Sequence, residues 1–221
     1  MAYRRTERVV QRLNARRDTI VAAAVALAAE QGMDAVQVVP VAERAGIAAG
    51  TVYRYFPAKT DLVAALVADV SARELAAIRG ASDSAPGPLS ALTAAIVTCA
   101  ARALRQRRLT WALIVEPVEQ PIAALRFVYR TALAAEFEAR IRAAADDGHL
   151  PEQDHALAAA AILGALMEGL IGPLAPAADE AKARDAVQGA ALLALRALGV
   201  VDARARGLVV QAALPAIETA A

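Results

Sequence analysis

Apolar residues recur every three or four positions along this chain, which is the spacing of one face of an α-helix. Between Ile20 and Ala28 this repeat predicts a first helix that begins near Thr6 or Asp18 and ends at Gln31, before Gly32. The repeat then predicts two short helices and a series of longer ones. Their expected ranges are 38–45, 48–55, 57–79, 89–107, 109–115, 122–147, 153–171, 178–198 and 202–217.

Signals for β-strands are nearly absent. Of the 221 residues, 58% are hydrophobic, but many of these are alanine, the strongest helix former, and runs of β-branched or aromatic residues are scarce. The segment Gly80–Pro88, GASDSAPGP, has the composition of a linker between two helices. We therefore expect an all-α protein that is long enough to bury a sizeable core.

Charge is distributed unevenly along the chain. The formal net charge is +1, but residues 1–62 hold nine Lys and Arg against six Asp and Glu. Most of this excess lies in the first seventeen residues, where six arginines accompany one glutamate. Such a basic segment is typical of proteins that bind an anionic partner. The alternative is that these charges form a helix face that is simply in contact with water. The six arginines are Arg4, Arg5, Arg8, Arg12, Arg16 and Arg17.

Several classes of protein find little support in the sequence. Cys99 is the only cysteine, which excludes an intrachain disulfide and a cysteine-rich metal site. His149 and His155 are six residues apart, which is not a helical metal-ligand spacing. A phosphate-binding glycine loop and a nucleophile elbow are both missing. We therefore expect no metal, no cofactor and no enzymatic activity.

The Arg-rich N-terminus does not resemble a secretory signal, so a cytoplasmic location is expected. One segment, Ala156–Ala178, is long and apolar enough to raise the question of a membrane span. Glu168 in its middle and the interruption at Gly172–Pro173 favour a buried or subunit-interface helix instead. A helical enzyme or a membrane-associated helical protein remains an alternative function for such an all-α chain.

The two short helices at 38–45 and 48–55 suggest a helix-turn-helix. That motif needs a small residue where the helices cross, a residue that tolerates positive φ in the turn, and an apolar residue after it. Ala42, Gly46 and Ile47 meet these needs in order. Two other tightly packed helices could show the same three residues, so the second helix has to decide.

At 100° per residue, Val52 and Phe56 fall on one face of that second helix and are expected to be buried. On its outward face, a glycine would let the helix backbone come close to DNA. A hydroxyl, a guanidinium and two flanking phenols on the same face suit hydrogen bonds to base edges and phosphates in a major groove. These outward residues are Gly50, Thr51, Arg54, Tyr53 and Tyr55. Pro57 is expected to start the next helix, where Lys59 in the first turn would complete an anion site.

The segment VAERAGIAAGTVYRYFPAKTDLVAALV closely resembles the DNA-binding segment of TetR-family transcriptional regulators, whose pattern is AG-[VI]-S-x-G-T-[LV]-Y-x-[YH]-F-x-x-K-x-x-L. The resemblance covers about Asp18 to Leu66. It departs from the family at Ala48 and Gln37, where a Ser or Thr and a Thr usually cap the two helices. The matching residues are Ala45, Gly46, Ile47, Gly50, Thr51, Val52, Tyr53, Tyr55, Phe56, Lys59 and Leu62.

The resemblance implies an N-terminal three-helix DNA-binding domain, expected at 1–62, and a larger helical domain for ligand binding and dimerisation, expected at 63–221. It further implies a homodimer that responds to a small inducer, and we expect a repressor that binds a palindromic operator and is released by that inducer. The apolar residues of the larger domain favour a mostly apolar inducer. The candidate DNA-binding residues are Gln37, Arg44, Gly50, Thr51, Tyr53, Arg54, Tyr55 and Lys59.

Helices 153–171 and 178–198 are rich in small residues, which permit close helix packing, so we expect the dimer interface there. Packing of both helices inside one subunit is the alternative. The ligand is expected between the helices from Leu89 to Glu168, although each aromatic residue there is also consistent with plain core. The candidate ligand-binding residues are Ile96, Cys99, Trp111, Arg126, Phe127 and Glu168.

Overall fold

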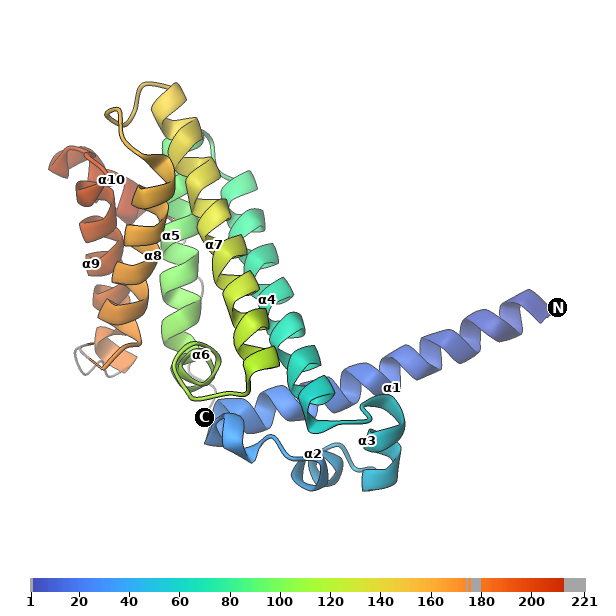
Figure 1. Ribbon diagram of the computed structural model, residues 1–221. Coiled ribbons are helices and arrows are strands. Elements are labelled where there is room, and N and C mark those ends of the chain that lie inside the picture. Colours follow the sequence, from blue (N-terminus) through green and yellow to red (C-terminus); the bar gives the residue numbers. More distant parts are fainter. Residues whose placement is uncertain (1, 174, 176–179, 213–221) are drawn as a thin grey trace.

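The computed structural model describes residues 2–173, 175 and 180–212 of the chain. Every regular element in this part is helical, which confirms the predicted all-α fold (Figure 1). The first elements are α1 (Ala2–Gln31), η1 (Met33–Ala35), α2 (Val38–Arg44), α3 (Ala49–Tyr55) and α4 (Lys59–Asp83). They are followed by α5 (Pro88–Arg105), α6 (Arg107–Ile114), α7 (Gln120–Asp146), α8 (His155–Leu170), α9 (Glu180–Ala197) and α10 (Asp202–Gln211).

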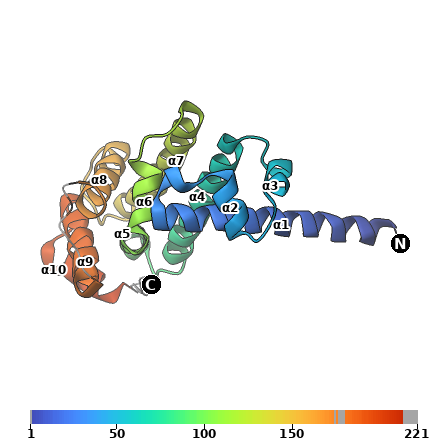
Figure 2. The same ribbon diagram turned by 90° about the horizontal axis from the view of Figure 1, so that it is seen from below.

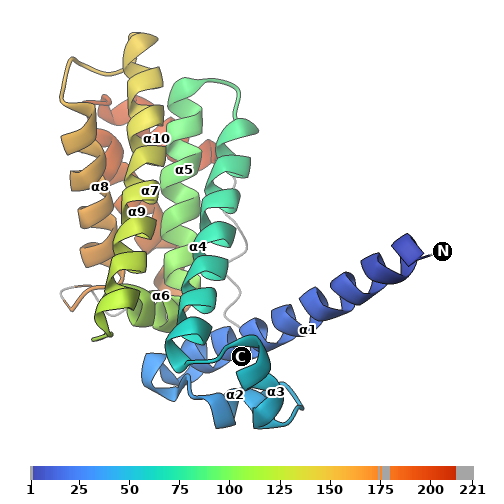
Figure 3. The same cartoon turned by 45° about the vertical axis from the view of Figure 1, so that its right-hand side comes forward.

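The helices form two groups. We call residues 18–66 the N-terminal unit; in it α1 crosses above the short helices α2 and α3 (Figures 1 and 2). We call the described residues from Val67 onward the body; its long helices run roughly side by side, with α9 and α10 behind α7 and α5 in Figure 3. The long helix α4 belongs to both groups, because it starts beside α3 and ends in the body.

The bounds of α4 correct two predictions. Pro57 does not start this helix, because Ala58 is its N-cap residue and Lys59 its first helical residue. The helix also continues through Gly80 to Asp83, so the first four of the nine residues of the predicted linker are helical. Ile78 and Ser82 explain this extension, since both are buried on the inner face and the Ser82 hydroxyl donates a 2.9 Å hydrogen bond to the Ile78 carbonyl.

Two hydrophobic cores lie along α4. Leu62 and Leu66 are fully buried in the core of the N-terminal unit, whereas Ile78 is buried in the core of the body. The N-terminal core also includes Leu109 from α6 and Ile122 from α7. The N-terminal unit therefore completes its core with side chains of the body, which ties the position of α6 to that of α1.

Within the described residues, no helix combines the length and apolar character that crossing a membrane requires. Of the apolar segment Ala156–Ala178, α8 ends at Leu170, and residues 174 and 176–178 lie outside the described part. Several small residues on α8 face outward, among them Ala161, Gly164 and Ala165. The start of the predicted helix 178–198 and the end of the predicted helix 202–217 also lie outside the described residues.

Candidate DNA-binding and ligand sites

The turn between α2 and α3 has the geometry of a helix-turn-helix. Gly46 has a φ of +65°, which a residue with a side chain rarely adopts. The Gly46 N–H donates to the Glu43 carbonyl at 3.1 Å and the Ile47 N–H to the Ala42 carbonyl at 3.0 Å. These two hydrogen bonds form a Schellman motif that ends α2 and turns the chain into α3.

Helix α3 presents the face that its periodicity predicts. Val52 and Phe56 have 0% and 2% of their surface exposed, which confirms their inward orientation. Gly50 and Arg54 are exposed and Tyr53 is 53% exposed. Thr51 and Tyr55 are half-buried, and the Arg54 guanidinium lies 5.8 Å from the centre of the Tyr55 ring. Viewed from below, α2 and α3 lie on the same side of the molecule (Figure 2).

Two of the candidate DNA-binding residues already have protein partners. Arg44 forms an ion pair with Glu30 of α1, with one hydrogen bond of 2.7 Å, and this contact lowers the pKa of Glu30 and raises that of Arg44. The Gln37 side chain donates to the Asp34 carbonyl at 3.0 Å and does not cap α2. Both residues therefore hold the backbone around α2 in place, and either would have to exchange its partner to contact a phosphate.

The N-terminus of α4 contains Lys59 and, in addition, a carboxylate. Asp61 accepts a 2.9 Å hydrogen bond from the Ala58 N–H, and so satisfies one of the free amides at this helix end. The sequence reasoning missed this residue, although Asp at the third position of a helix is a familiar N-terminal signal. A phosphate bound here would meet the amides and Lys59 together with the negative charge of Asp61.

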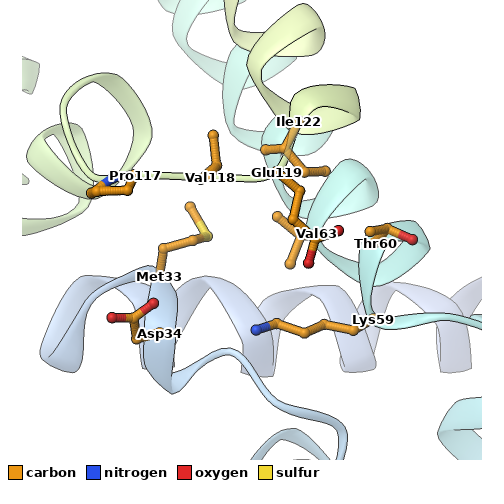
Figure 4. A pocket seen from close by; sticks show the side chains of 9 residues that line it. All are labelled: Met33, Asp34, Lys59, Thr60, Val63, Pro117, Val118, Glu119 and Ile122. Carbon is orange, nitrogen blue, oxygen red and sulfur yellow. The ribbon is translucent and has the colours of Figure 1, made fainter.

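Lys59 also lines a cavity of about 340 Å³ between the N-terminal unit and the connection from α6 to α7. Its side chain extends along the cavity toward Asp34 (Figure 4). Met33 and Val63 contribute apolar surface from the N-terminal unit, and Val118 contributes it from the body. Because its walls come from both groups of helices, the shape of this cavity depends on how the two are oriented.

A set of polar contacts fixes that orientation. The Glu116 carboxylate accepts a 2.7 Å hydrogen bond from the Met33 N–H and pairs with Arg108. Arg108 also donates a 2.9 Å hydrogen bond to the Gln31 carbonyl at the end of α1. Gly32 has a φ of +94°, which residues with a side chain rarely adopt, and a Cβ atom there would displace the ends of the Arg108 and Glu116 side chains.

Arg126 holds α6 from the other side. Its side chain is 8% exposed and donates to the carbonyl of Glu116 at 2.6 Å and to that of Ala112. Burial lowers the pKa of Arg126, and the nearby Glu116 carboxylate opposes this effect. A cation at the C-terminal end of a helix is electrostatically favourable. Arg126 thus stabilises the end of α6, and it does not line the cavity in the body that is described next.

The candidate ligand cavity lies in the body, between α4, α5, α6, α7 and α8. Its volume is about 30 Å³, room for one or two water molecules. Glu74 lies in its wall and accepts two 2.7 Å hydrogen bonds from Arg102. The other lining residues are mostly apolar and include Val70, Ile78, Leu109, Leu113, Leu133 and Met167.

Two ionisable groups in this wall are neutral at ordinary pH. Burial raises the pKa of the Cys99 thiol to about 12. Burial likewise raises the pKa of the Tyr129 phenol well above its ordinary value. The cavity therefore contains one internally neutralised ion pair and several neutral polar groups.

Of the six candidate ligand-binding residues, only Cys99 lines this cavity. Ile96 is fully buried in the body core, and Trp111 packs against that core. Phe127 is 72% exposed on α7, and Glu168 is exposed on α8. The sequence reasoning missed Glu74, although it continues the inner stripe Leu62, Leu66, Val70 at the next fourth position.

A wide groove runs between α8 and α9. It has a volume of about 640 Å³. Leu193 on its wall is 61% exposed, and Gly169 and Gly189 leave the helix backbones uncovered. The other lining residues include Ala165, Lys182, Asp185, Ala190 and Ala197.

Comparison with known proteins agrees with the helix-turn-helix geometry. The model of the family described as bacterial regulatory proteins, tetR family, matches residues 20–66. The HTH-type transcriptional repressor KstR of Rhodococcus jostii strain RHA1 is 44% identical over 72 residues, which are 33% of this chain and 32% of that protein. KstR of Mycolicibacterium smegmatis is 52% identical over 48 residues, 22% of this chain and 24% of its own length. The alignments thus span about a third or less of these curated relatives.

Solved structures resemble the chain over most of its length. RolR in complex with resorcinol has a TM-score of 0.65 at 24% identity, covering 95% of this chain and 100% of that one. A TetR-like transcriptional regulator from Rhodococcus sp. RHA1 has a TM-score of 0.62 at 20% identity, covering 83% and 95%. Identities this low establish the fold alone. Together with the match at residues 20–66, they show a helix-turn-helix segment of the tetR type at residues 20–66 within an all-helical fold like that of these solved regulators.

Proposed function

We propose that this protein is a transcriptional repressor that binds a palindromic DNA operator as a homodimer and leaves it when a small, mostly apolar ligand enters the body cavity. The outward face of α3 carries this proposal. It combines an exposed glycine, a hydroxyl, a guanidinium and an exposed phenol on a helix whose other face is anchored by Val52 and Phe56. The curated relatives are repressors, which supports repression over activation.

The polar residues of α3 are suited to different parts of a DNA duplex. Gly50 allows the backbone to approach the groove closely, and Thr51 and Arg54 can reach base edges or phosphates. Tyr53 can donate a hydrogen bond to a phosphate oxygen and so position the helix without reading sequence. Lys59 and the free amides at the start of α4 supply a further phosphate contact.

The groove between α8 and α9 supports the proposed homodimer. Its exposed apolar surface would be unfavourable in contact with water, and its small residues let helices of a second copy approach closely. A twofold arrangement would bring α8 and α9 of both copies into a four-helix interface. Two α3 helices related by the same twofold axis would then match two half-sites of a palindromic operator.

The lining of the body cavity indicates an uncharged ligand. The Glu74 carboxylate and the Arg102 guanidinium neutralise each other through two hydrogen bonds, so a charged ligand would find no free counter-charge there. The Tyr129 phenol can serve an uncharged hydroxyl or carbonyl group. At about 30 Å³ the cavity has to widen before a ligand fits, and this requires its helices to move apart.

Helix α6 connects that widening to DNA binding. Leu109 and Leu113 line the ligand cavity and at the same time belong to the core of the N-terminal unit. A shift of α6 would therefore disturb the contacts of Arg108 and Glu116 with the end of α1. The ligand would favour an orientation of the N-terminal unit in which two α3 helices no longer match successive half-sites.

A regulator of this kind needs no catalytic activity, and we propose that the protein is not an enzyme and works in the cytoplasm, where its operator is. Duplexes selected from a genomic pool should share an inverted repeat, and their binding should weaken steeply as salt concentration rises. Tyr53→Phe combined with Lys59→Ala should lower affinity for the selected site at least tenfold. The control, Arg142→Ala on α7, should leave it unchanged. Catalysis without any selected duplex would contradict the proposal.

A further inference from the structure

Helix α1 extends far beyond the N-terminal unit. Its residues from Val9, where the description of burial begins, to Thr19 are all exposed, and Ile20 is the first fully buried residue after them. We call residues 2–17 the arm; it projects away from α2 and α3 as a free helix (Figures 1 and 2). At 1.5 Å per residue, the arm reaches about 22 Å beyond Arg17.

The arm is joined rigidly to the unit that carries α3. Arg17 lies over the ring of Phe56, with 5.2 Å between the guanidinium carbon and the ring centre. Phe56 in turn is buried directly after α3. The direction of the arm relative to α3 is therefore set by a packed contact in addition to the continuous helix.

Two exposed arginines of the arm stand without an ion-pair partner among the residues that the structure describes. Arg12 and Arg16 lie one turn apart on the same side of the helix, both are exposed, and neither forms an ion pair with any described residue. Like charges at this spacing repel each other and slightly destabilise a free helix. Arg4, Arg5 and Arg8 precede them in the same helix. An anionic surface would offset this repulsion.

The arm points away from the groove between α8 and α9. In Figure 1, α9 lies at one side of the molecule and the N-terminus at the opposite side. If a second copy binds at that groove, the two arms extend outward from the dimer, past the outer ends of the two half-sites. This step rests on the proposed function, because it takes the position of DNA from α3 and that of the partner from the groove.

We propose that the arm is a second DNA-binding element, which contacts phosphates flanking the operator on the outer side of each half-site. Arg12 and Arg16 are about 6 Å apart along the helix axis, and a DNA strand carries a phosphate every 3.4 Å or so of its axis. Two such side chains can therefore neutralise separate phosphates. These contacts carry no sequence information, so they add affinity and extend the bound site without changing the sequence that α3 reads.

A membrane surface is the competing anionic partner. Val9, Val10 and Leu13 are each about half-exposed, which gives the arm an apolar strip of the kind found in interfacial helices. The contact between Arg17 and Phe56 favours DNA, since it fixes the direction of the arm relative to α3. A bilayer that met the arm would also have to accommodate the polar face of that helix.

The test compares the wild-type protein with Arg12→Ala combined with Arg16→Ala, because alanine preserves the helix. Affinity is measured on the selected operator with ten flanking base pairs on each side and on the same operator without flanks. Trimming should weaken the wild type and leave the variant unaffected. On the long duplex, the slope of log affinity against log salt should be lower by about 3.6 for the variant, because each of the two arms in the dimer loses two phosphate contacts.

The control variant, Arg130→Ala combined with Arg142→Ala, removes the same charge from α7 and should behave like the wild type. Equal salt slopes and equal sensitivity to trimming in wild type and variant would overturn the arm proposal while leaving the regulator intact. Loss of binding to phosphatidylglycerol vesicles without any change on DNA would overturn it in favour of a membrane. If the wild type selects no duplex at all, the proposed function fails first and the arm proposal fails with it.

Discussion

The backbone N–H of Met33 donates a 2.7 Å hydrogen bond to the carboxylate of Glu116, across 83 residues of sequence. Met33 begins η1, directly after α1, and Glu116 follows α6. This contact joins the end of α1 to the end of α6, a helix that lines the candidate ligand cavity. It therefore ties the N-terminal unit to the body.

Glu116→Ala should loosen this junction. Met33 is 5% exposed, so its N–H would lose its partner in a place that water reaches poorly, and Arg108 would lose its carboxylate. We expect the free energy of unfolding, measured by urea denaturation, to fall by about 1–3 kcal/mol. Glu119→Ala is the matched control, since Glu119 is exposed and forms no ion pair with a described residue. Equal losses in both variants would show that the junction contact is not stabilising.

Acid should destabilise the protein partly through Glu136. Burial acts to raise the pKa of Glu136, but hydrogen bonds from Arg79 and Arg140 outweigh it and hold the pKa below its ordinary value. A carboxyl whose pKa is lower in the folded state stabilises the fold above its unfolded pKa, about 4.3, and loses that contribution as pH falls through the folded pKa. Urea denaturation between pH 7 and pH 3 should show stability declining over this window.

Glu136→Gln should flatten that decline, because the amide does not titrate. Glu152→Gln is a suitable control: Glu152 is exposed, follows α7 and forms no ion pair with a described residue. Parallel pH profiles for wild type and Glu136→Gln would argue against a role of this carboxylate in acid stability.

Local sequence patterns were sufficient for the helix-turn-helix. The burial of Val52 and Phe56 follows from the periodicity of one helix, and the turn follows from Gly46 and the residues on either side of it. The sequence was less informative about α4. Gly80 and the serines after it suggested a linker, but the helix continues because Ile78 and Ser82 pack against the body, and a local pattern cannot show that contact.

The candidate ligand cavity is a second case in which local sequence patterns were not sufficient. Phe127 was assigned to it because it is aromatic, yet it lies on the solvent side of α7. The buried residues of α7 are Ile122, Arg126, Leu133, Phe137, Ile141 and Ala144. A count of helical spacing would have placed it outside. That Arg102 pairs with Glu74 depends on how α5 packs on α4, which neither helix specifies by itself.

Ala48→Ser should stabilise α3. Ala48 has extended backbone angles, φ −72° and ψ 143°, and occupies the N-cap position without a side-chain hydrogen bond. A serine hydroxyl at this position can accept a hydrogen bond from a free amide in the first turn, a gain of about 0.5–1 kcal/mol in unfolding free energy. Ala49→Ser, one residue further on, lies inside the helix and should give no gain. Denaturation curves in which both variants match the wild type would contradict this interpretation.

Leu193→Glu should dissociate the proposed dimer into monomers. The side chain is 61% exposed in the single chain, so a glutamate there costs little in folding, but it would be buried without a partner between two copies. Sedimentation equilibrium at micromolar concentration should show a monomer. Val210→Glu on α10, where the native valine is 77% exposed outside the groove, should remain dimeric. A dimeric Leu193→Glu protein would move the interface elsewhere.

Gly50→Ala should stabilise α3 and at the same time weaken DNA binding. Gly50 lies within the helix, and a Cβ atom added there meets nothing within 4 Å. Alanine should therefore raise the unfolding free energy by about 0.5–1 kcal/mol. The same methyl group would point outward and keep the helix backbone from the groove, so affinity for the operator should fall several-fold.

Gly80→Ala supplies the comparison, because Gly80 is also helical, exposed and free of neighbours within 4 Å, but lies near the far end of α4. It should raise stability to a similar extent and leave operator affinity unchanged. If Gly50→Ala binds the operator as tightly as Gly80→Ala, the backbone at Gly50 does not approach DNA. The α3 face would then have to contact DNA through Tyr53 and Arg54, further along the helix.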